Sequence, residues 1–454
     1  MLYPVLQDPL RPVVGSLFDR PRGASIGQML FGAGEQGGWY DVADLSTLFQ
    51  DSAGATPVTA VEQQVGRILD KSGRGNHATQ VTATKRPVYS RRVNLLTKTE
   101  QFDDAVWLPK NITLTLGQSG IPDIAPVAVR ITPTATSGAH GFAAFFVAAR
   151  NSTTHSVYVK ADGYSKVGFK ESSTSGWFAA FDLNSVTVLS STPGSLPTIQ
   201  ALAGGWCRIS FSPVTTNAGQ SFDVRVLPNS YVSGDTNAAG FAGDGVSGVL
   251  MCGPQMEDGL TATPYQRVTT AADYDADPAK FPAYLRFDGV DDALQTGNID
   301  FTSTDKMAVW AGVDKVTGSA TGVIVESSGS FSSNNGAFAL LGHSTLGFEF
   351  ASRGTALSDT TFNPSPPASP SIVTASFDIG GGSVVRRVNS QQSAITANQG
   401  TGQYGNYPVY IGGRSAASLF FNGRLYSLIV RGAQTPLSQI EATELYIKQK
   451  MRMP

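Results

Sequence analysis

Acidic residues that could work as a catalytic pair occur in this sequence side by side. Glycoside hydrolysis needs two carboxyl groups that face each other across a bound sugar. Neighbouring residues of a β-strand point to opposite faces of the sheet, so adjacent carboxylates do not make an acid and base couple. We therefore predict that the chain is not an enzyme. The adjacent acidic pairs are Asp103/Asp104, Glu257/Asp258 and Asp291/Asp292.

Serine and histidine give no catalytic or metal-binding pattern either. Ser25 lies in GASIG, which matches the G-x-S-x-G motif of hydrolases, but no strand is predicted before it as that motif requires. The histidines lie far apart and show no i, i+2 or i, i+4 spacing, so a zinc site is disfavoured. They are His77, His140, His155 and His343.

Side chains suited to sugar binding form two sets. Aromatic faces stack on the C–H groups of sugars, and planar polar groups bond to the hydroxyls. Trp177 follows a loop of small residues with Tyr164 nearby in the sequence, and we predict that both line a ligand groove. Ordinary packing inside a sandwich is the alternative. A polar loop and two arginines supply the second set of glycan-binding candidates: Phe331, Asn334, Asn335, Arg353 and Arg414.

The elements that must position these residues are short β-strands. The 454 residues include 49 glycines and 25 prolines, and 41% are hydrophobic, which is typical of strands joined by turns around packed cores. Apolar and polar residues alternate at 207–211 and 222–226, as in half-buried strands. A single core stops growing at about 250 to 300 residues, so two or more domains are expected. The predicted class is all-β.

Three local patterns predict turns and a helix. Asn422 and Gly423 stand between two apolar runs and predict a hairpin, because both residues tolerate positive φ. Ser438 with Glu441 forms the pattern of a capping box at the start of a short C-terminal helix. The prolines of 363–370 cannot donate ladder hydrogen bonds and predict a loop.

The first 33 residues follow neither strand nor helix periodicity and predict an extended N-terminal arm. Such an arm cannot bury its apolar side chains by itself, so we expect it to dock on another subunit or on its own sandwich. The two cysteines, Cys207 and Cys252, are too few for a disulfide framework, and we expect them to pack as apolar thiols.

Charge and hydropathy exclude two classes of partner. There are 33 basic and 35 acidic residues, for a formal net charge of −2, so no basic face is expected and nucleic acid is not a predicted partner. The N-terminus has prolines where a signal peptide needs an apolar stretch, and no apolar run reaches membrane-spanning length. We expect a soluble chain made in the cytoplasm.

Two groups of short sequence segments resemble known domains. GGWYDVADLSTLFQD, DKSGRGNHATQ, KRPVY and YLRFDGVDDALQTG resemble the opening of concanavalin A-like, laminin-G-like sandwiches, although here they are split between Tyr89 and Tyr284. The segment between them opens NLLTKTEQFDDAVW, ends VLMCGPQMEDGLTATPYQRV, and is similar to the carbohydrate-binding-like jelly rolls of phage tail and virion proteins. The resemblance implies two antiparallel β-sandwiches, one inserted into the other. The expected domains are an arm (1–33), the laminin-G-like sandwich in two parts (34–93 and 268–454) and the inserted jelly roll (94–267).

The resemblance also implies a role. It suggests a structural component of a phage particle, such as a tail fibre, spike or head-decoration protein, found in the virion. Such proteins are usually homotrimers that contact other virion proteins, here through the arm, and bind a host surface glycan for attachment. A purely structural decoration protein is the alternative. A polysaccharide depolymerase is disfavoured, because the E-x-D-x-x-E pattern of concanavalin A-like glycosidases is missing.

Two further expectations concern carboxylates. Jelly rolls of this kind often hold a structural calcium ion near the chain ends, and Asn94 and Glu257 stand at comparable positions; a turn-capping role for Glu257 is the alternative. No other cofactor is predicted. In FDGVDD we expect a turn, with Phe287 in the core and the aspartates bonded to local amides.

Overall fold

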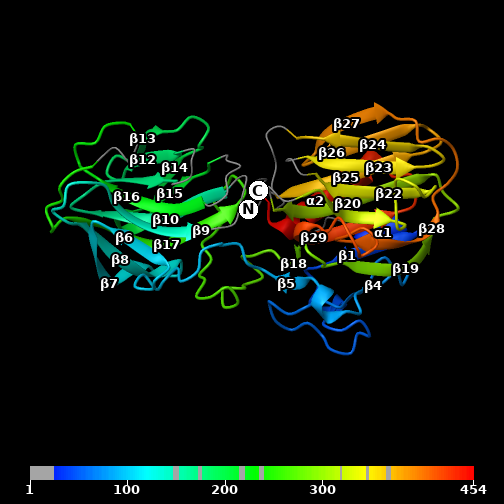
Figure 1. The fold of residues 1–454 in the computed structure, drawn as a ribbon, viewed down its shortest axis with the longest axis horizontal. Helices are drawn as coiled ribbons and strands as arrows, with labels where there is room; N and C mark the ends of the chain where they lie inside the picture. Colours follow the sequence, from blue (N-terminus) through cyan, green and yellow to red (C-terminus); the bar gives the residue numbers. More distant parts are fainter. Residues whose placement is uncertain are drawn as a thin grey trace, which may run out of the picture.

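The computed structural model describes residues 25–146, 153–171, 176–213, 220–234, 240–316, 320–343, 347–364 and 370–453. Two lobes lie side by side, one built from the middle of the chain and the other from its two outer parts (Figure 1). Each lobe is a sandwich of antiparallel sheets, which confirms the predicted all-β class. We call the lobe of the middle segment the inserted sandwich and the other the host sandwich.

The inserted sandwich has two sheets that face each other across one core. In the first the strand order is β14 (Thr198–Ala201), β15 (Trp206–Phe211), β10 (Thr153–Asp162), β17 (Gly248–Asp258), β8 (Ala125–Pro133) and β7 (Ile112–Ile121). In the second it is β13 (Thr187–Ser191), β12 (Phe178–Asp182), β11 (Lys166–Lys170), β16 (Gln220–Leu227), β9 (His140–Phe146) and β6 (Trp107–Lys110).

The alternation of apolar and polar residues along the strands explains how this core forms. Ile209 and Phe211 of β15 and Val224 of β16 are at most 1% exposed and pack in the same core, whereas the residues between them face away. The predicted alternating strands are therefore confirmed. Cys207 lies in this core and Cys252 in a small cluster on the outer face of the first sheet, both as buried free thiols.

The host sandwich is also two sheets around a core. One has the order β27 (Gln391–Thr396), β26 (Ser383–Val388), β25 (Ser371–Asp378), β20 (Lys306–Lys315), β29 (Asn422–Arg431), β18 (Tyr284–Asp288) and β5 (Val88–Ser90), with β1 (Gly37–Asp41) also paired to β29. The other runs β2 (Leu48–Phe49), β3 (Arg67–Ile68), β4 (Ala78–Thr79), β19 (Leu294–Asp300), β28 (Asn406–Ile411), β21 (Gly322–Ser327), β22 (Ala337–Gly342), β23 (Phe348–Arg353) and β24 (Leu357–Phe362). Short 3₁₀ turns lie at Leu45–Thr47, Ala83–Lys85 and Ala203–Gly205.

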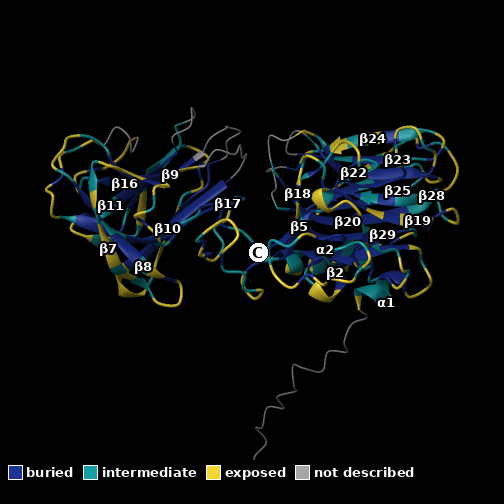
Figure 2. Ribbon diagram, turned by 60° about the horizontal axis from the view of Figure 1, so that its bottom comes forward, coloured by how far each residue is buried: buried dark blue, intermediate teal, exposed yellow. Residues whose placement is uncertain are grey.

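Segments from both outer parts of the chain build the host core. Tyr40 and Tyr89 pack with Phe287, Val309 and Leu428. The two parts are thus joined by strand pairing and by shared burial of apolar side chains, the main favourable term in folding. Figure 2 shows buried residues following the strands while exposed residues gather in the connecting loops.

Two helices cover the outer face of the host sheet that contains β20. Helix α2 (Leu437–Met451) buries Ile447 and Met451 against this face, and α1 (Ile26–Phe31) buries Leu30 and Phe31 in the same cluster. A Cβ atom at Gly312 would lie 2.7 Å from atoms of Ile447 and Met451. The glycine therefore lets α2 approach the sheet closely. Among the described residues, no helix is long and apolar enough to cross a membrane.

The reading of 25–33 as part of an extended arm is wrong for Ile26–Phe31, which form α1. Ser25 caps this helix, accepting a hydrogen bond from the backbone N–H of Gln28 at 3.2 Å. A six-residue helix is too short to show a period in the sequence, and the surface that stabilises it comes from distant strands. The remainder of the predicted arm, residues 1–24, lies outside the described residues, as do 365–369 of the predicted proline loop.

Two other local predictions are corrected. Asn422 and Gly423 do not form a hairpin turn; they open β29 and pair with Asp288 and Lys315. The C-terminal helix is confirmed, but Ser438 does not cap it. The helix begins at Leu437, with Pro436 as a cap residue that makes no side-chain hydrogen bond. Long-range strand pairing overrides the turn preference in the first case, and a backbone preset by proline starts the helix in the second.

Candidate functional site

Five sequence candidates come together on the host sandwich, and we call Phe331, Asn334, Asn335, Arg353 and Arg414 the rim cluster. Residues of β22 alternate between the main host core and a second, smaller apolar cluster on the outer face of the same sheet. Phe331, which is 5% exposed, packs in that outer cluster, and this fixes the loop after β21 over the sheet. The rim cluster therefore rests on a strand platform.

Glu326 anchors this loop. Its side chain is fully buried, accepts a hydrogen bond from the backbone N–H of Phe331 at 2.7 Å and pairs with Arg414 Nε at 3.2 Å. The Arg414 guanidinium lies 4.6 Å from the centre of the Phe331 ring. A cation over an aromatic face is held by the ring quadrupole. Arg414 is thus oriented by one charge and one ring, and it stays partly exposed.

Arg353 and the two asparagines form the other side of the rim cluster. Arg353 Nε donates to Asn335 Oδ1 at 3.1 Å, and its Nη1 donates to the Ser332 carbonyl at 3.1 Å. The hydroxyl of Tyr407 donates to the Asn335 carbonyl at 3.1 Å. Asn334 lies in the same turn and Asn335 is exposed. Amide and guanidinium groups therefore face solvent together, a chemistry that suits hydroxyl-rich ligands.

A carboxyl pair that the sequence analysis missed extends from the rim cluster. Glu349 of β23 and Asp359 of β24 interact on the outer face of the sheet, within the electrostatic reach of Arg414. Burial, and then the neighbouring Asp359, raises the pKa of Glu349 to about 7. Sheet register creates this proximity: Glu349 pairs with Thr361 and Asp359 with Ala351. The outward-facing alternation of both strands was the only available signal.

The two candidates of the inserted sandwich are not brought together. Lys166 pairs with Asp182 and Lys170 with Phe178 in the antiparallel pair of β11 and β12. Tyr164 lies two residues before β11 and Trp177 directly before β12, so the length of the strand pair separates them. Tyr164 is 8% exposed and its ring lies 5.3 Å from that of Phe241. Trp177 is partly exposed and packs against the core. Burial leaves little of the Tyr164 ring for sugar stacking.

Asn94 and Glu257, the calcium candidates, form hydrogen bonds near the two chain ends of the inserted sandwich. Asn94 Nδ2 donates to the carbonyls of Pro254 and Gln266 at 3.0 Å, and its Oδ1 accepts from Leu96 and Met256 N–H groups at 3.1 Å. The amide has no bonding capacity left for a cation in this arrangement.

Glu257 is likewise committed to local bonds. Its carboxylate accepts hydrogen bonds from the Thr263 N–H at 2.9 Å, the Thr263 hydroxyl and Gln255 Nε2 at 2.8 Å. Burial raises the pKa of Glu257. These contacts give Glu257 the turn-capping role that was the alternative to calcium binding.

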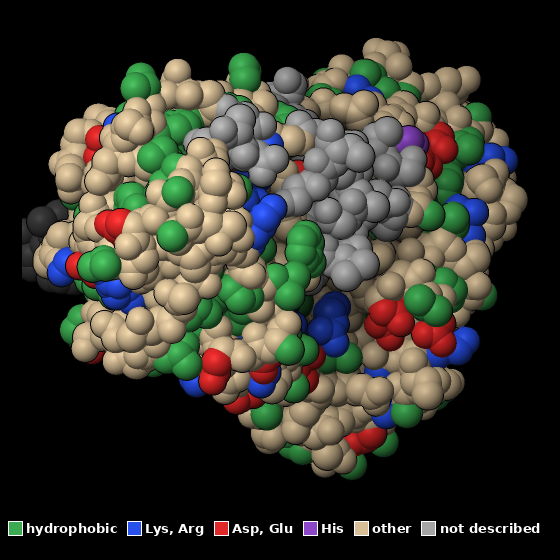
Figure 3. Space-filling view, turned by 60° about the vertical axis from the view of Figure 1, so that its left-hand side comes forward, with side chains coloured by type: hydrophobic (Ala, Val, Ile, Leu, Met, Phe, Trp, Pro, Cys, Tyr) green, Lys and Arg blue, Asp and Glu red, His purple; other side chains and the backbone are tan. Residues whose placement is uncertain are grey.

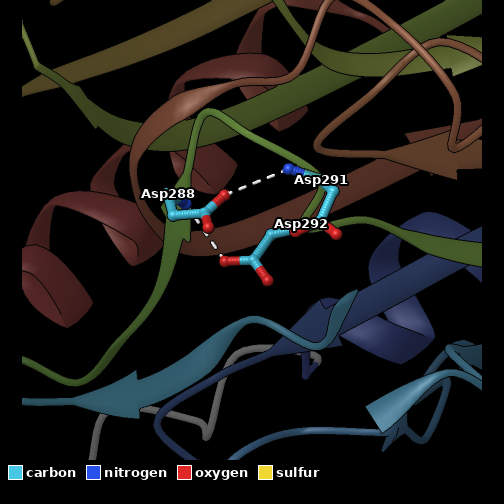
Figure 4. Close-up of side chains that lie close together, drawn as sticks. All are labelled: Asp288, Asp291 and Asp292. Atoms are coloured by element: carbon cyan, nitrogen blue, oxygen red, sulfur yellow. Dashed lines mark hydrogen bonds between the residues drawn. The ribbon is translucent and has the colours of Figure 1, made fainter. Parts of the chain in front are cut away.

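The aspartates of FDGVDD form the predicted turn (Figure 4). Asp288 Oδ1 accepts from the N–H of Val290 at 2.8 Å, and Asp292 Oδ2 accepts from the N–H of Asp288 at 3.0 Å. Gly289 has a φ of +77°, and Phe287 is 1% exposed in the core. The carboxylate oxygens of Asp288, Asp291 and Asp292 lie within 4.8 Å of one another. Turn formation accounts for this cluster without an ion.

A pocket of about 210 Å³ lies where the two sandwiches meet, with Arg92, Tyr284, Arg286 and Arg424 in its wall. Arg424 forms salt bridges to both sandwiches. Its Nη2 lies 3.0 Å from Asp258 of the inserted sandwich, and its Nη1 lies 3.0 Å from Asp314 of the host. Lys and Arg side chains elsewhere on the face in Figure 3 are scattered among Asp and Glu rather than gathered in a patch.

Comparisons with known proteins give only weak likenesses. No family model and no curated protein matches the chain. One similar solved structure is the CBM40 module of the Ruminococcus gnavus IT-sialidase bound to α2,3-sialyllactose, at 12% identity over 33% of this chain and 97% of that chain, with a TM-score of 0.27. Another is the mouse laminin α1 chain, domains LG4–5, at 13% identity over 65% and 86% of the two chains, with a TM-score of 0.26. Likenesses of this size carry no argument about function.

Proposed function

We propose that this chain is a non-enzymatic structural component of a phage particle that binds glycans through the rim cluster. The observation that carries the glycan proposal is the convergence of Asn335, Arg353 and Arg414 around Phe331 on one sheet face. Planar amides and guanidinium groups held in fixed positions bind sugar hydroxyls with little loss of side-chain entropy. Multivalent display would then turn weak contacts into firm attachment.

The carboxyl groups beside the rim cluster support the non-enzymatic proposal. Glu349 and Asp359 act on each other electrostatically. Retaining glycosidases hold their two carboxyl groups about 5 Å apart and inverting ones roughly 6.5 to 9.5 Å apart, so that a sugar or water fits between. The sheet register places Glu349 and Asp359 diagonally on adjacent strands of one face, so they do not face each other across a cleft as a catalytic pair does. Concentrated protein is expected to release no reducing ends from polysaccharide.

The proposed virion role rests on sequence resemblance and on the arrangement of the chain as two sandwiches behind an N-terminal segment. We propose that residues 1–33 dock on other virion proteins and that the chain assembles as a homotrimer. Removing residues 1–24, which leaves α1 in place, should abolish incorporation into particles, as measured by immunoblotting purified particles. Incorporation of the truncated chain at the full-length level would contradict the docking proposal.

Glycan binding is tested with the full-length chain and a panel of immobilised bacterial surface polysaccharides, measured by biolayer interferometry. Saturable binding is expected, with a loss of about tenfold or more in the Asn335→Ala/Arg353→Ala variant, because at least two hydrogen-bonding groups are removed. Asn298→Ala is the matched control: it removes an exposed asparagine of the same sandwich whose side chain bonds to the Asn406 carbonyl and not to a residue of the rim cluster. Unchanged binding by the double variant would exclude the rim cluster.

A purely structural decoration protein is the second candidate, and one observation favours it. Arg414 pairs with Glu326, and Arg353 of β23 bonds to the loop after β21, so the rim residues brace the fold as well as face solvent. This candidate predicts no saturable binding to any polysaccharide by the wild-type chain. It also predicts that the Asn335→Ala/Arg353→Ala variant lowers thermal stability, which circular dichroism would measure in the same samples.

A further inference from the structure

A second pocket lies on the inserted sandwich, away from the rim cluster. It has a volume of about 250 Å³ and is formed on the outer face of β14 and β15, beneath the segment that follows β17. Thr198 and Gln200 of β14 pair with Ser210 and Arg208 of β15, which places all four side chains on the same face. Apolar side chains close the remaining walls: Leu196, Leu260 and Ala262.

The segment after β17 is fixed over this face by its backbone carbonyls. Ser212 Oγ donates to the carbonyl of Leu260 at 3.3 Å, and Thr154 Oγ1 donates to that of Gly259 at 2.9 Å. Arg208 Nη2 donates to the carbonyl of Thr263 and to Ser156 Oγ, the latter at 3.1 Å. The wall is therefore built before any ligand arrives, which limits the ordering that binding would require.

Arg208 has bonding capacity that the chain leaves unused. Among the described residues its Nη1 makes no hydrogen bond and the guanidinium forms no ion pair, whereas Nη2 is bonded to Ser156 and Thr263 and the buried Nε is out of a ligand's reach. The ring of Tyr158 lies under it, 5.3 Å from the guanidinium carbon. Glu257 is the acidic group that acts on Arg208 electrostatically, but its carboxylate is bonded to Thr263. A positive charge thus faces the pocket without a counter-charge in direct contact, which favours an anionic ligand.

The rest of the lining selects for a polyhydroxylated ligand. Thr198 Oγ1 and Ser210 Oγ lie 2.6 Å apart and share one hydrogen bond, which leaves hydroxyl acceptor and donor capacity toward the pocket. Gln200 adds an exposed amide. Pockets for drug-sized ligands range from about 300 to 1,000 Å³, so a volume of about 250 Å³ suits one sugar residue rather than an oligosaccharide.

We propose that this pocket binds a single carboxylate-bearing sugar residue of a glycan, with Arg208 pairing to the carboxylate and Thr198, Gln200 and Ser210 bonding to the hydroxyls. The inference rests on the proposed glycan-binding function and adds a second site with a defined ligand class. It places acidic recognition on the inserted sandwich, separate from the rim cluster of the host.

The test uses the full-length chain with methyl β-D-glucuronide and methyl β-D-glucoside as probes, measured by saturation-transfer NMR and titration calorimetry. The two probes differ only in the carboxylate. Binding of the glucuronide is expected to be at least about tenfold tighter than that of the glucoside, because a charge-assisted hydrogen-bond pair is present in one and missing in the other. Equal binding of both probes, or binding of neither, overturns the proposal.

Two variants locate the site. Arg208→Gln removes the charge and is expected to abolish the preference for glucuronide; Ala262→Phe fills the pocket and should block both probes while leaving the contacts of Arg208 to Ser156 and Thr263 in place. Arg130→Gln is the matched control, since Arg130 lies on β8 of the same sheet and is paired with Asp162. Glucuronide preference that persists in Ala262→Phe would overturn the location.

These experiments distinguish failure of the pocket proposal from failure of the proposed glycan binding at the rim cluster. Polysaccharide binding that depends on Asn335 and Arg353 but is insensitive to Arg208→Gln, with no preference between the two probes, would overturn this inference and leave the proposed function standing. Glucuronide binding that is sensitive to Arg208→Gln and insensitive to the rim variant would support the inference and shift the glycan contact to the inserted sandwich.

Discussion

Buried arginines in the two sandwiches have different surroundings. In the host, Arg387 pairs with Glu444 at 2.7 Å, Arg431 with Glu35 at 2.7 Å and Arg424 with two aspartates. Each of these pairs joins elements that are distant in the sequence. The host therefore uses buried charge to tie its strands, its helices and the inserted sandwich into one structure.

In the inserted sandwich, the buried arginine pairs within its own strand. Arg225 pairs with Asp223 on the same strand, yet Arg225 Nε and Nη1 and Asp223 Oδ1 are buried without a hydrogen-bond partner, as is Arg208 Nε. Unsatisfied buried polar groups destabilise a fold and are rare in native proteins, so their presence calls for a functional explanation. The host also buries an arginine nitrogen without a partner, Arg386 Nε. The difference between the sandwiches is therefore in their ion pairs: the host pairs link distant elements, whereas Arg225 and Asp223 pair within one strand.

The largest loss of stability should come from removing the Arg424 salt bridges that link the two sandwiches. Arg424→Ala removes the guanidinium that pairs with Asp258 and Asp314 where the sandwiches meet, and we expect a loss of about 3 to 5 kcal/mol in the free energy of unfolding, measured by urea denaturation. Arg286→Ala serves as control, because its side chain is 47% exposed and its pair with Glu62 should contribute less than about 1 kcal/mol. Similar losses in both variants would contradict the structural role of Arg424.

Acid should weaken the inserted sandwich through His155. Burial among aromatic rings lowers the pKa of His155 to about 3. A histidine with a depressed pKa contributes stability above its unfolded value of about 6.5 and loses it as the pH falls toward 3. Between pH 8 and pH 5 the loss should be about 2 kcal/mol, seen as lower protection of the β10, β15 and β16 amides against hydrogen exchange after correction for intrinsic rates. His155→Phe should remove this dependence, and a persistent effect would assign it elsewhere.

Replacing the partly satisfied pair should be neutral or stabilising. Asp223→Leu/Arg225→Met substitutes apolar groups for a buried pair with three unsatisfied atoms, and we expect a change between zero and roughly 1 kcal/mol in favour of the folded state. Thermal unfolding with Arg225→Met alone as reference measures it, since the single variant leaves Asp223 uncompensated and should be less stable than wild type. A strongly destabilised double variant would show that the pair is structural after all.

The smallest effect should run in the opposite pH direction in the host. Because the pKa of Glu349 is raised to about 7, the stability associated with its protonated form is present below its unfolded value and is lost as the pH rises through 7. Solvent screening should hold the change below about 1 kcal/mol. Exchange of β23 and β24 amides should slow as the pH falls from 8 to 5.5, after correction for intrinsic rates, and Glu349→Gln should abolish the change.

The local sequence pattern was sufficient to predict a strand where every second residue along it is buried. Alternation at 207–211 and 222–226 predicted β15 and β16 correctly, because one face of each strand is buried whatever lies opposite. It was insufficient at Asn422 and Gly423, where pairing with Asp288 and Lys315 stabilises a strand over a turn. Residue type likewise selected the rim candidates, whereas the contact between Arg414 and Phe331 depends on how two loops pack.

The sequence by itself determined the all-β class, the strands with alternating apolar residues, the C-terminal helix and the turn at FDGVDD, because each depends on neighbouring residues. Only the tertiary structure decided that Arg208 faces a pocket without a carboxylate partner, that Glu349 and Asp359 share a sheet face, and that Tyr164 is buried. These features depend on register and on packing between distant segments, where the interaction that decides the outcome is not encoded within any one stretch of the chain.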